Sequence, residues 1–336
     1  MISLRLCHRL PKSRFASQSS EFTKFIFGIS RFHKVKKCLT GFLVTLFYIF
    51  DKSCRKLFVF LQKIITSLSP QYPELTFKLY LESAMAADKC AMLKARSDLA
   101  AGKEVISIST AAEVAPDSLF KDTISASADF GSISYEFICQ AFSIYEDEIN
   151  DSKAQVRSIS SMISCLVSCN MLEKGDYEAL ITKTAQSGAR LVKKSDQCKI
   201  ILLCSHLFYR TSEDDSISPG KLSCCYRNPQ RVLECLQRSL KIADGCMTSS
   251  SSANLQLFID ILEQYVYFFE KENPAITDTF VSRLIALINE LIDSTRDYSD
   301  ASIQAQSHYR HILHYIAKKK QSSESASAGR FSLIVT

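Results

Sequence analysis

The sequence predicts an all-α protein in which antiparallel helix pairs stack side by side into an α-solenoid. The 336 residues contain only nine Gly and seven Pro, so few positions interrupt a regular backbone. Apolar residues recur at intervals of three and four through most of the chain, which is the period of a helix with one buried face. Roughly ten such segments follow one another, with about forty residues per pair, and this is the pattern of HEAT-like repeats.

The positive charge of the chain is confined to its N-terminal part. Residues 1–56 hold 12 Lys and Arg against 2 acidic residues, whereas the other 280 residues hold 29 against 33. The part expected to fold is therefore mildly acidic, which argues against nucleic-acid binding, because that needs a basic face on the domain itself. We expect residues 1–54 to be a divergent basic segment, poorly ordered and outside the solenoid. Its start is also typical of an organellar transit peptide.

The apolar run Leu39–Phe50 lies within this N-terminal segment. Its twelve residues fall short of the roughly 20 that a transmembrane helix needs. A buried or interfacial helix is the expected alternative. Regular helical periodicity begins only at Arg55, so we place the solenoid at residues 55–320 and a C-terminal tail at residues 321–336.

A break in the periodicity divides the first helices from the rest. The stretch PELTFKLYLESAMAAD, which starts at Pro73, predicts a helix with a buried face. Residues 91–133 are then rich in Ser, Ala and Asp, and Gly102, Pro116 and Gly131 interrupt any period. We expect a flexible insertion there, because long loops inside a compact array are otherwise uncommon.

The stretch Tyr135–Gln155 predicts a helical hairpin with an acidic corner. Its apolar residues fall on one helical face: Ile138, Ala141, Phe142, Tyr145 and Ile149. After the acidic residues 146–148, either Asp151 or Ser152 is suited to cap the next helix, since both side chains accept hydrogen bonds from a free helix N-terminus.

Further helices are predicted to follow this hairpin. Residues 156–172 and 177–192 have helical periodicity. In LVKKSDQCKIILLCSHLFYR we expect Ser195 to be the N-cap and a buried stripe to form from Ile200, Leu203, Leu207 and Phe208. Residues 210–228 are polar and predict a loop. Helices are then expected from Pro229, in LQLFIDILEQYVYFFEKEN, at residues 280–292 and at residues 303–316.

Catalytic and metal-binding patterns are weak in this sequence. It contains no GxxxxGK, GxGxxG or GxSxG motif, so we expect no cofactor and no enzyme activity. The pairs Cys165/Cys169 and Cys224/Cys225 lack CxxC spacing and a nearby His. On a helix, His308, His311 and His314 diverge too far to share one ion. The acidic corner is more typical of a solvated or partner-facing patch, and no thiol has an evident His partner for nucleophilic catalysis.

Four stretches of the chain resemble a known family. IYEDEINDSKAQ and PELTFKLYLESAMAAD resemble segments of the retromer large scaffold subunit, vacuolar protein sorting-associated protein 35. So do KKSDQCKIILLCSHLFYR and LFIDILEQYVYFFEKEN. The departures include Ser195 where the family has Pro and Tyr209 where it usually has Trp. The resemblance covers residues 55–90 and 134–320, which correspond to the C-terminal half of the family.

The resemblance implies a cytoplasmic scaffold, peripheral on endosomal or prevacuolar and Golgi membranes, that serves retromer in protein sorting. In the family, this half binds vacuolar protein sorting-associated protein 29, a metallophosphoesterase-like structural subunit, and any metal would belong to that partner. By the resemblance, His206, Leu207, Phe208 and Tyr209 form the contact. From the pattern alone, His206 is equally well a hydrogen-bonded core residue.

Two further expectations follow from the resemblance. The family holds vacuolar protein sorting-associated protein 26 through a PRLYLM motif that these 336 residues do not contain, so we expect no direct binding of that subunit. An alternative function is a shortened relative that its basic N-terminus redirects to an organelle or membrane.

Overall fold

The computed structural model describes residues 51–100, 129–210, 226–247, 253–294, 300–321 and 328–335. Within these ranges the elements are almost all helices, together with one isolated bridge between Tyr209 and Arg227. The helices are α3 (Asp51–Leu68), α4 (Pro73–Ala100), α5 (Phe130–Asp147), α6 (Ser152–Ser168), α7 (Lys174–Ala189), α8 (Lys194–Cys204), the 3-10 helix η3 (Ser205–Phe208), α9 (Pro229–Met247), α10 (Ala253–Glu270), α11 (Asp278–Ser294), α12 (Asp300–Gln321) and α13 (Ala328–Phe331).

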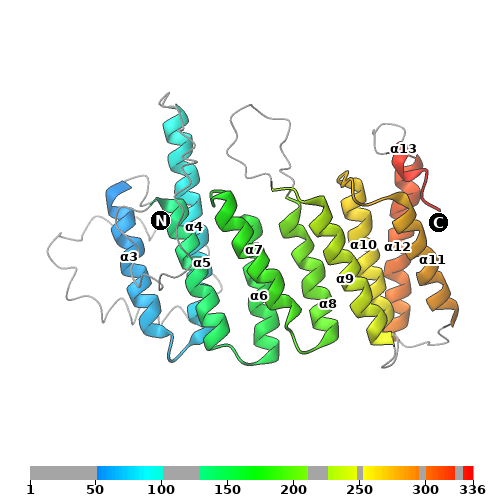
Figure 1. The fold of residues 1–336 in the computed structure, drawn as a ribbon, viewed down its shortest axis with the longest axis horizontal. Coiled ribbons are helices and arrows are strands. Elements are labelled where there is room, and N and C mark those ends of the chain that lie inside the picture. Colours follow the sequence, from blue (N-terminus) through cyan, green and yellow to red (C-terminus); the bar gives the residue numbers. More distant parts are fainter. Residues whose placement is uncertain are drawn as a thin grey trace, which may run out of the picture.

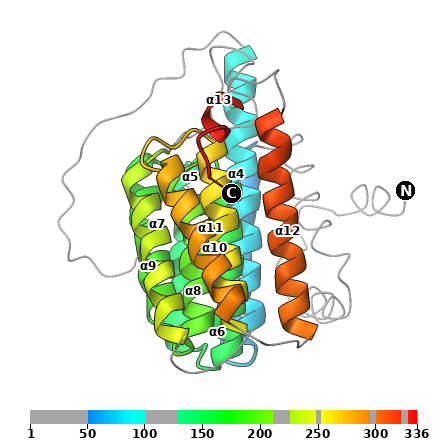
Figure 2. The ribbon, with the colours of Figure 1, turned by 90° about the vertical axis from the view of Figure 1, so that its right-hand side faces the viewer.

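The helices stand side by side in chain order and form two layers (Figure 1). The even-numbered helices α4, α6, α8, α10 and α12 contact one another in succession and form one layer. Seen along the array, α7 and α9 lie on one side, and α4 and α12 lie on the other (Figure 2). Each even-numbered helix from α4 to α10 also packs against the helix that follows it in the chain. The predicted all-α solenoid of stacked antiparallel pairs is confirmed.

A continuous apolar core runs along the whole array between the layers. Aromatic side chains fill it at regular intervals, and the fully buried ones include Phe58, Phe137, Tyr177, Phe258 and Phe268. This is the arrangement that the helical periodicity requires, because each helix hides one face on its neighbours.

The acidic corner between α5 and α6 forms as predicted. Asp151 is the N-cap of α6, and its side chain accepts a hydrogen bond of 2.7 Å from the Ala154 N–H. On α5, Ile138, Ala141 and Phe142 are buried. The alternating pattern was therefore sufficient to predict both the faces of these helices and their junction.

The predicted insertion differs from the structure at both of its ends. Helix α4 continues to Ala100, and α5 begins at Phe130, so both ends of the segment 91–133 are helical. Residues 101–128 between them lie outside the described residues. Gly131 does not break a helix but lies in the first turn of α5, where a Cβ atom would come within 2.7 Å of the Met171 carbonyl oxygen. Close packing on the α6–α7 connection explains this glycine.

Two local expectations about α8 were wrong. The helix begins at Lys194, its N-cap residue is Lys193, and Ser195 lies in the first turn. Leu203 is 43% exposed, whereas the adjacent Leu202 is buried. Because apolar residues surround most of this helix, periodicity alone did not distinguish its buried face from its exposed one.

At the chain ends, α3 starts at Asp51, and the run Leu39–Phe50 lies outside the described residues. Within the expected C-terminal tail, by contrast, Phe331 and Ile334 are buried against the last helices. None of the helices in the described ranges has the length and apolarity needed to cross a membrane.

Candidate partner-binding surface

The residues predicted to contact a partner lie at the junction between α8 and α9. Three of them point inward: Leu207, Phe208 and Tyr209 are between 0% and 6% exposed. The backbone there is fixed by hydrogen bonds from the Asn228 N–H to the Phe208 carbonyl (2.7 Å) and from the Arg210 N–H to the Tyr226 carbonyl (2.9 Å). In this structure these three side chains anchor the junction and do not form an outer surface.

His206 is the predicted residue that reaches the surface, and it is half-buried. Its ring lies 5.0 Å from the Tyr267 ring and 5.2 Å from the Phe268 ring, both on α10. Burial lowers the pKa of the imidazole, and a hydrogen bond with Gln264 opposes that shift. The ring is therefore neutral at neutral pH, as an aromatic environment favours. His206 thus has features of both predicted roles: its ring packs on the core, as a core residue would, and it keeps an accessible edge, as a partner contact would.

Apolar side chains are also exposed toward the C-terminal ends of even-numbered helices. The even-numbered helices run in the same direction, so their C-terminal ends meet at one edge of the array, the upper edge in Figure 1. Val167 of α6 is 41% exposed, Leu203 of α8 is 43% exposed and Tyr315 of α12 is 39% exposed, and Tyr267 of α10 is half-buried. We call Val167, Leu203, His206, Tyr267 and Tyr315 the apolar edge.

Polar contacts hold the N-terminal part of the apolar edge. Arg210 donates hydrogen bonds to the carbonyls of Cys169 (2.6 Å) and Val167 (2.8 Å) at the end of α6. A third bond, of 2.6 Å, reaches the Asn170 side chain. These bonds tie the second residue after η3 to the end of α6, so the positions of Val167 and His206 depend on each other.

A buried carboxylate fixes the same connection from the other side. Asp88 of α4 is 1% exposed, and it accepts hydrogen bonds from the backbone N–H groups of Asn170 (3.0 Å) and Met171 (2.7 Å). Burial raises the pKa of the Asp88 carboxyl, while these bonds and the charge of Arg210 limit the rise. The α6–α7 connection is thus held between a buried anion and a cation.

Similar contacts extend the edge toward the C-terminus. The Tyr177 hydroxyl donates to the Leu207 carbonyl (3.0 Å), and the Tyr209 hydroxyl donates to the Lys271 carbonyl (3.3 Å). Glu270, at the end of α10, accepts a hydrogen bond of 2.6 Å from Tyr315 and pairs with Lys319 at 2.7 Å. Four consecutive even-numbered helices are therefore joined at the edge where the apolar side chains are exposed.

The eight thiols whose side chains the structure describes are buried or half-buried. Burial raises the pKa of Cys139 and of Cys235 to about 11 and that of Cys198 to about 12. The Cys165 and Cys169 sulfur atoms lie 4.0 Å apart, and Cys224 and Cys225 lie outside the described residues. Cys139, Cys198 and Cys235 therefore stay protonated at neutral pH, where nucleophilic catalysis would need the thiolate.

The described residues contain no group of three or more potential metal ligands. His308 faces α10, with its Nδ1 atom 3.0 Å from the Gln256 amide and its Nε2 atom 3.8 Å from a Glu263 oxygen. His311 and His314 are exposed on other parts of α12. The structure therefore does not bring the three histidines to one point.

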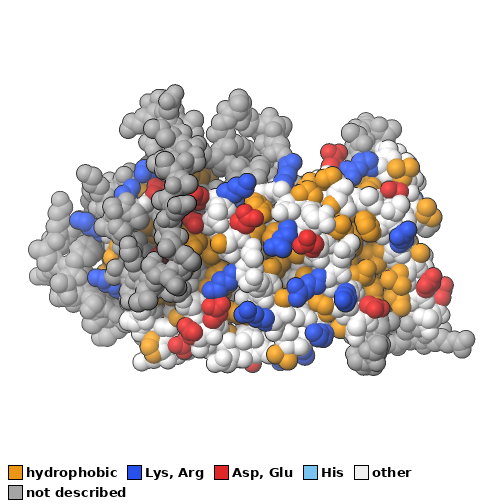
Figure 3. All heavy atoms as spheres, viewed as in Figure 1, with side chains coloured by type: hydrophobic (Ala, Val, Ile, Leu, Met, Phe, Trp, Pro, Cys, Tyr) orange, Lys and Arg blue, Asp and Glu red, His pale blue; other side chains and the backbone are white. Residues whose placement is uncertain are grey.

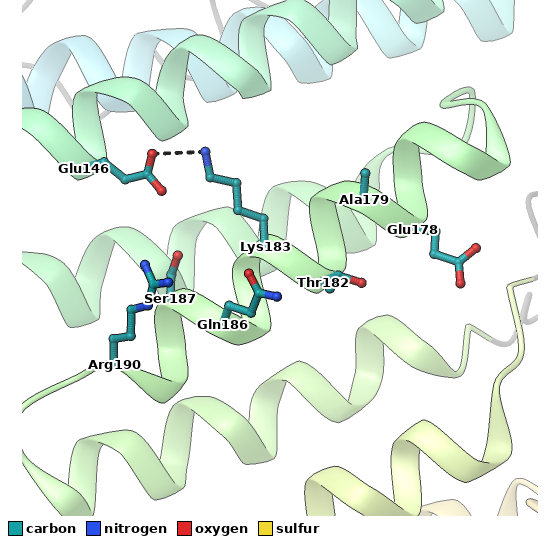
Figure 4. A pocket seen from close by; sticks show the side chains of 8 residues that line it. All are labelled: Glu146, Glu178, Ala179, Thr182, Lys183, Gln186, Ser187 and Arg190. Carbon is teal, nitrogen blue, oxygen red and sulfur yellow. Dashed lines mark hydrogen bonds and ion pairs between the residues drawn. The ribbon is translucent and has the colours of Figure 1, made fainter. Parts of the chain in front are cut away.

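A shallow hollow of about 440 Å³ lies over α7, on the opposite layer (Figure 4). Lys183 crosses it, pairs with Glu146 at 3.0 Å and lies 4.8 Å from the centre of the Phe142 ring. Its other lining side chains include Arg190, Gln186 and Glu178. On this face, cationic and anionic side chains are interspersed over the middle of the array (Figure 3). The two carboxylates that line the hollow, Glu146 and Glu178, lie on opposite sides of Lys183 (Figure 4).

Comparison with known proteins identifies the family. The family model described as "Vacuolar protein sorting-associated protein 35" matches residues 22–291. The chain belongs to this family. The match starts 33 positions before Arg55, so the expectation that the family resemblance begins at Arg55 was wrong. The segment 1–54 is thus in large part family sequence, although residues 1–50 lie outside the described residues.

Individual members of the family support the match. The chain is 34% identical over 273 residues to vacuolar protein sorting-associated protein 35B of Arabidopsis thaliana, across 80% of this chain and 28% of the relative. It is 38% identical over 177 residues to vacuolar protein sorting-associated protein 35 of Schizosaccharomyces pombe, across 53% of this chain and 20% of the relative. The Dictyostelium discoideum protein of that name is 28% identical over 234 residues. The chain thus spans less than a third of the length of these relatives.

Proposed function

We propose that this chain is a non-enzymatic scaffold in vacuolar protein sorting, as part of a retromer-type complex that is peripheral on endosomal, prevacuolar and Golgi membranes. Family membership, an all-α solenoid and the raised pKa values of the Cys139, Cys198 and Cys235 thiols support this function. The apolar edge is the observation that carries it, because one edge of four joined helices presents apolar and aromatic groups to solvent. Such a ridge suits a flat partner surface.

We further propose that the apolar edge binds vacuolar protein sorting-associated protein 29. Leu203, His206 and Tyr267 would make the contact, since their side chains reach the surface beside one another. Leu207, Phe208 and Tyr209 would act from beneath by holding η3 in place. This assignment retains the predicted residues and divides them between contact and support.

The proposal is tested by titration calorimetry with the recombinant small subunit. Leu203→Asp places a charge on the exposed ridge, and His206→Arg places a permanent cation against the Tyr267 and Phe268 rings. Each change is expected to weaken binding at least about 30-fold, since losing a desolvated anchor costs roughly 2 kcal/mol or more.

The matched control is Val192→Asp. Val192 is 82% exposed in the connection between α7 and α8, at the opposite edge of the array. It should bind like wild type, and its melting temperature should match that of Leu203→Asp. If Leu203→Asp bound with wild-type affinity, the apolar edge would not be the contact.

For vacuolar protein sorting-associated protein 26 we propose no direct binding by these 336 residues, because they contain no PRLYLM segment. Gel filtration of the two purified proteins tests this proposal. A complex that eluted ahead of both components would contradict it.

A further inference from the structure

The C-terminal segment 328–335 packs into a groove between the last three long helices. Phe331 is 0% exposed and Ile334 is 2% exposed, whereas the neighbouring Leu333 and Val335 are 62% and 73% exposed. Two anchors three positions apart are thus inserted, and the residues between and after them remain outside. This is how a single helical turn of a short peptide binds a groove.

Each wall of the groove comes from a different helix. Phe269 of α10 meets the Phe331 ring edge-on, with 5.2 Å between ring centres. Ser282 of α11 accepts a hydrogen bond of 3.0 Å from the Val335 N–H. Lys320 of α12 donates one of 2.7 Å to the Ile334 carbonyl.

The hydrogen bonds from Lys320 and to Ser282 are to backbone groups of the segment. One further side chain of the segment contacts the groove, since the Arg330 guanidinium lies 4.7 Å from the centre of the Phe269 ring. A peptide of different sequence can make the same two hydrogen bonds, provided that it presents the same spacing of anchors. The groove therefore selects an aromatic side chain and a branched aliphatic side chain at i and i+3, it favours a cation directly before the aromatic residue, and it is tolerant at the exposed positions.

The segment is covalently attached to α12. Six residues, 322–327, separate Gln321 from α13 in the sequence, and covalent attachment raises the effective concentration of the segment at the groove. Two anchored side chains must offset the entropy lost when eight residues are ordered. The segment is therefore held by its tether as well as by its contacts, and a partner can displace it.

We propose that the groove between α10, α11 and α12 is a peptide-binding site for a partner segment with an aromatic residue followed three positions later by a branched aliphatic one. The chain's own C-terminal segment occupies the site when that partner is not bound. One wall of the groove, α12, and the helix that occupies it, α13, lie after the residues matched to the family. Apolar side chains also gather toward this end of the molecule in Figure 3.

The test uses a fluorescein-labelled peptide of the sequence AGRFSLIVT and the full chain, measured by fluorescence anisotropy. Phe331→Ala/Ile334→Ala removes both anchors and frees the groove, so this double variant should bind the peptide at least tenfold more tightly than wild type does. Leu333→Ala/Val335→Ala is the matched control, because it truncates two exposed apolar side chains of the same segment. It should bind as weakly as wild type.

A peptide with Ala at both anchor positions should not bind to any of these chains. If the double variant does not melt cooperatively, Ile334→Ala alone replaces it, with the same direction of change expected. Equal binding by wild type and the anchor variant, or no saturable binding by the folded variant, would overturn the proposal. Dimerisation of wild type that the anchor variant loses would show that a second copy fills the groove, and would overturn it equally.

Discussion

Asp88 allows a quantitative test of how the apolar edge is held. Asp88→Ala would leave the backbone N–H groups of Asn170 and Met171 without their acceptor in a buried place. A buried donor that loses its partner costs about 1–3 kcal/mol. After allowance for the carboxylate that is no longer desolvated, we expect the free energy of unfolding to fall by about 2–4 kcal/mol.

Asp88→Asn is the matched variant, because its amide oxygen still accepts a hydrogen bond at the same position. Its free energy of unfolding should fall by less than half as much as that of Asp88→Ala. Urea denaturation followed by far-ultraviolet circular dichroism measures both variants, and hydrogen exchange at the Asn170 and Met171 amides should accelerate only in Asp88→Ala. A loss below 1 kcal/mol for Asp88→Ala, or equal losses for the two variants, would refute the reasoning.

The pH dependence provides an independent check. Because burial raises the pKa of the Asp88 carboxyl in the folded state, the folded protein binds this proton more tightly than the unfolded chain does. The contribution of this group to stability is therefore largest below its ordinary pKa and is lost as pH rises through the raised pKa. The stability of wild type relative to Asp88→Asn should increase as pH falls from 7 toward about 4. A constant difference over this range would contradict the assigned shift.

Three further predictions concern the helix ends and the segment between α4 and α5. Asp151→Ala should lower the free energy of unfolding by about 1 kcal/mol. Asp151→Asn should lower it by much less, since Asn also caps helices. Equal losses for the two variants in urea denaturation would argue against the cap. Gly131→Ala should lower the free energy of unfolding by about 1–3 kcal/mol, because the added methyl group would clash with a backbone carbonyl. Gly175 has open space around it, so Gly175→Ala should raise the free energy of unfolding by about 0.5–1 kcal/mol. Thermal melts compare the two variants. Limited trypsin treatment should cut first at Lys103 or Lys121, and mass spectrometry that found the first cuts in the helices after residue 135 would contradict an accessible insertion.

The sequence by itself was sufficient for the helical architecture and for much of its detail. An apolar residue at every third or fourth position gives a helix one apolar face. That face must be buried against a neighbouring element, and this holds for any arrangement of the neighbours. Local signals are similarly independent of the fold, so Asp151 could be predicted as a cap from its position before a helical stretch. The family resemblance rested on four short stretches of sequence, in which the order of residues is unusual.

The tertiary structure decided which residues form the surface of the site. Apolar residues occupy nearly all sides of α8, so periodicity could not show that Leu202 is buried and Leu203 exposed. No local pattern marks Asp88 as buried, because its partners are the backbone N–H groups of Asn170 and Met171, which are distant in the chain. Burial and long-range backbone contacts arise only when the helices stack. The family resemblance singled out His206 as a proposed partner contact, and the packing showed that the Tyr267 ring lies beside it.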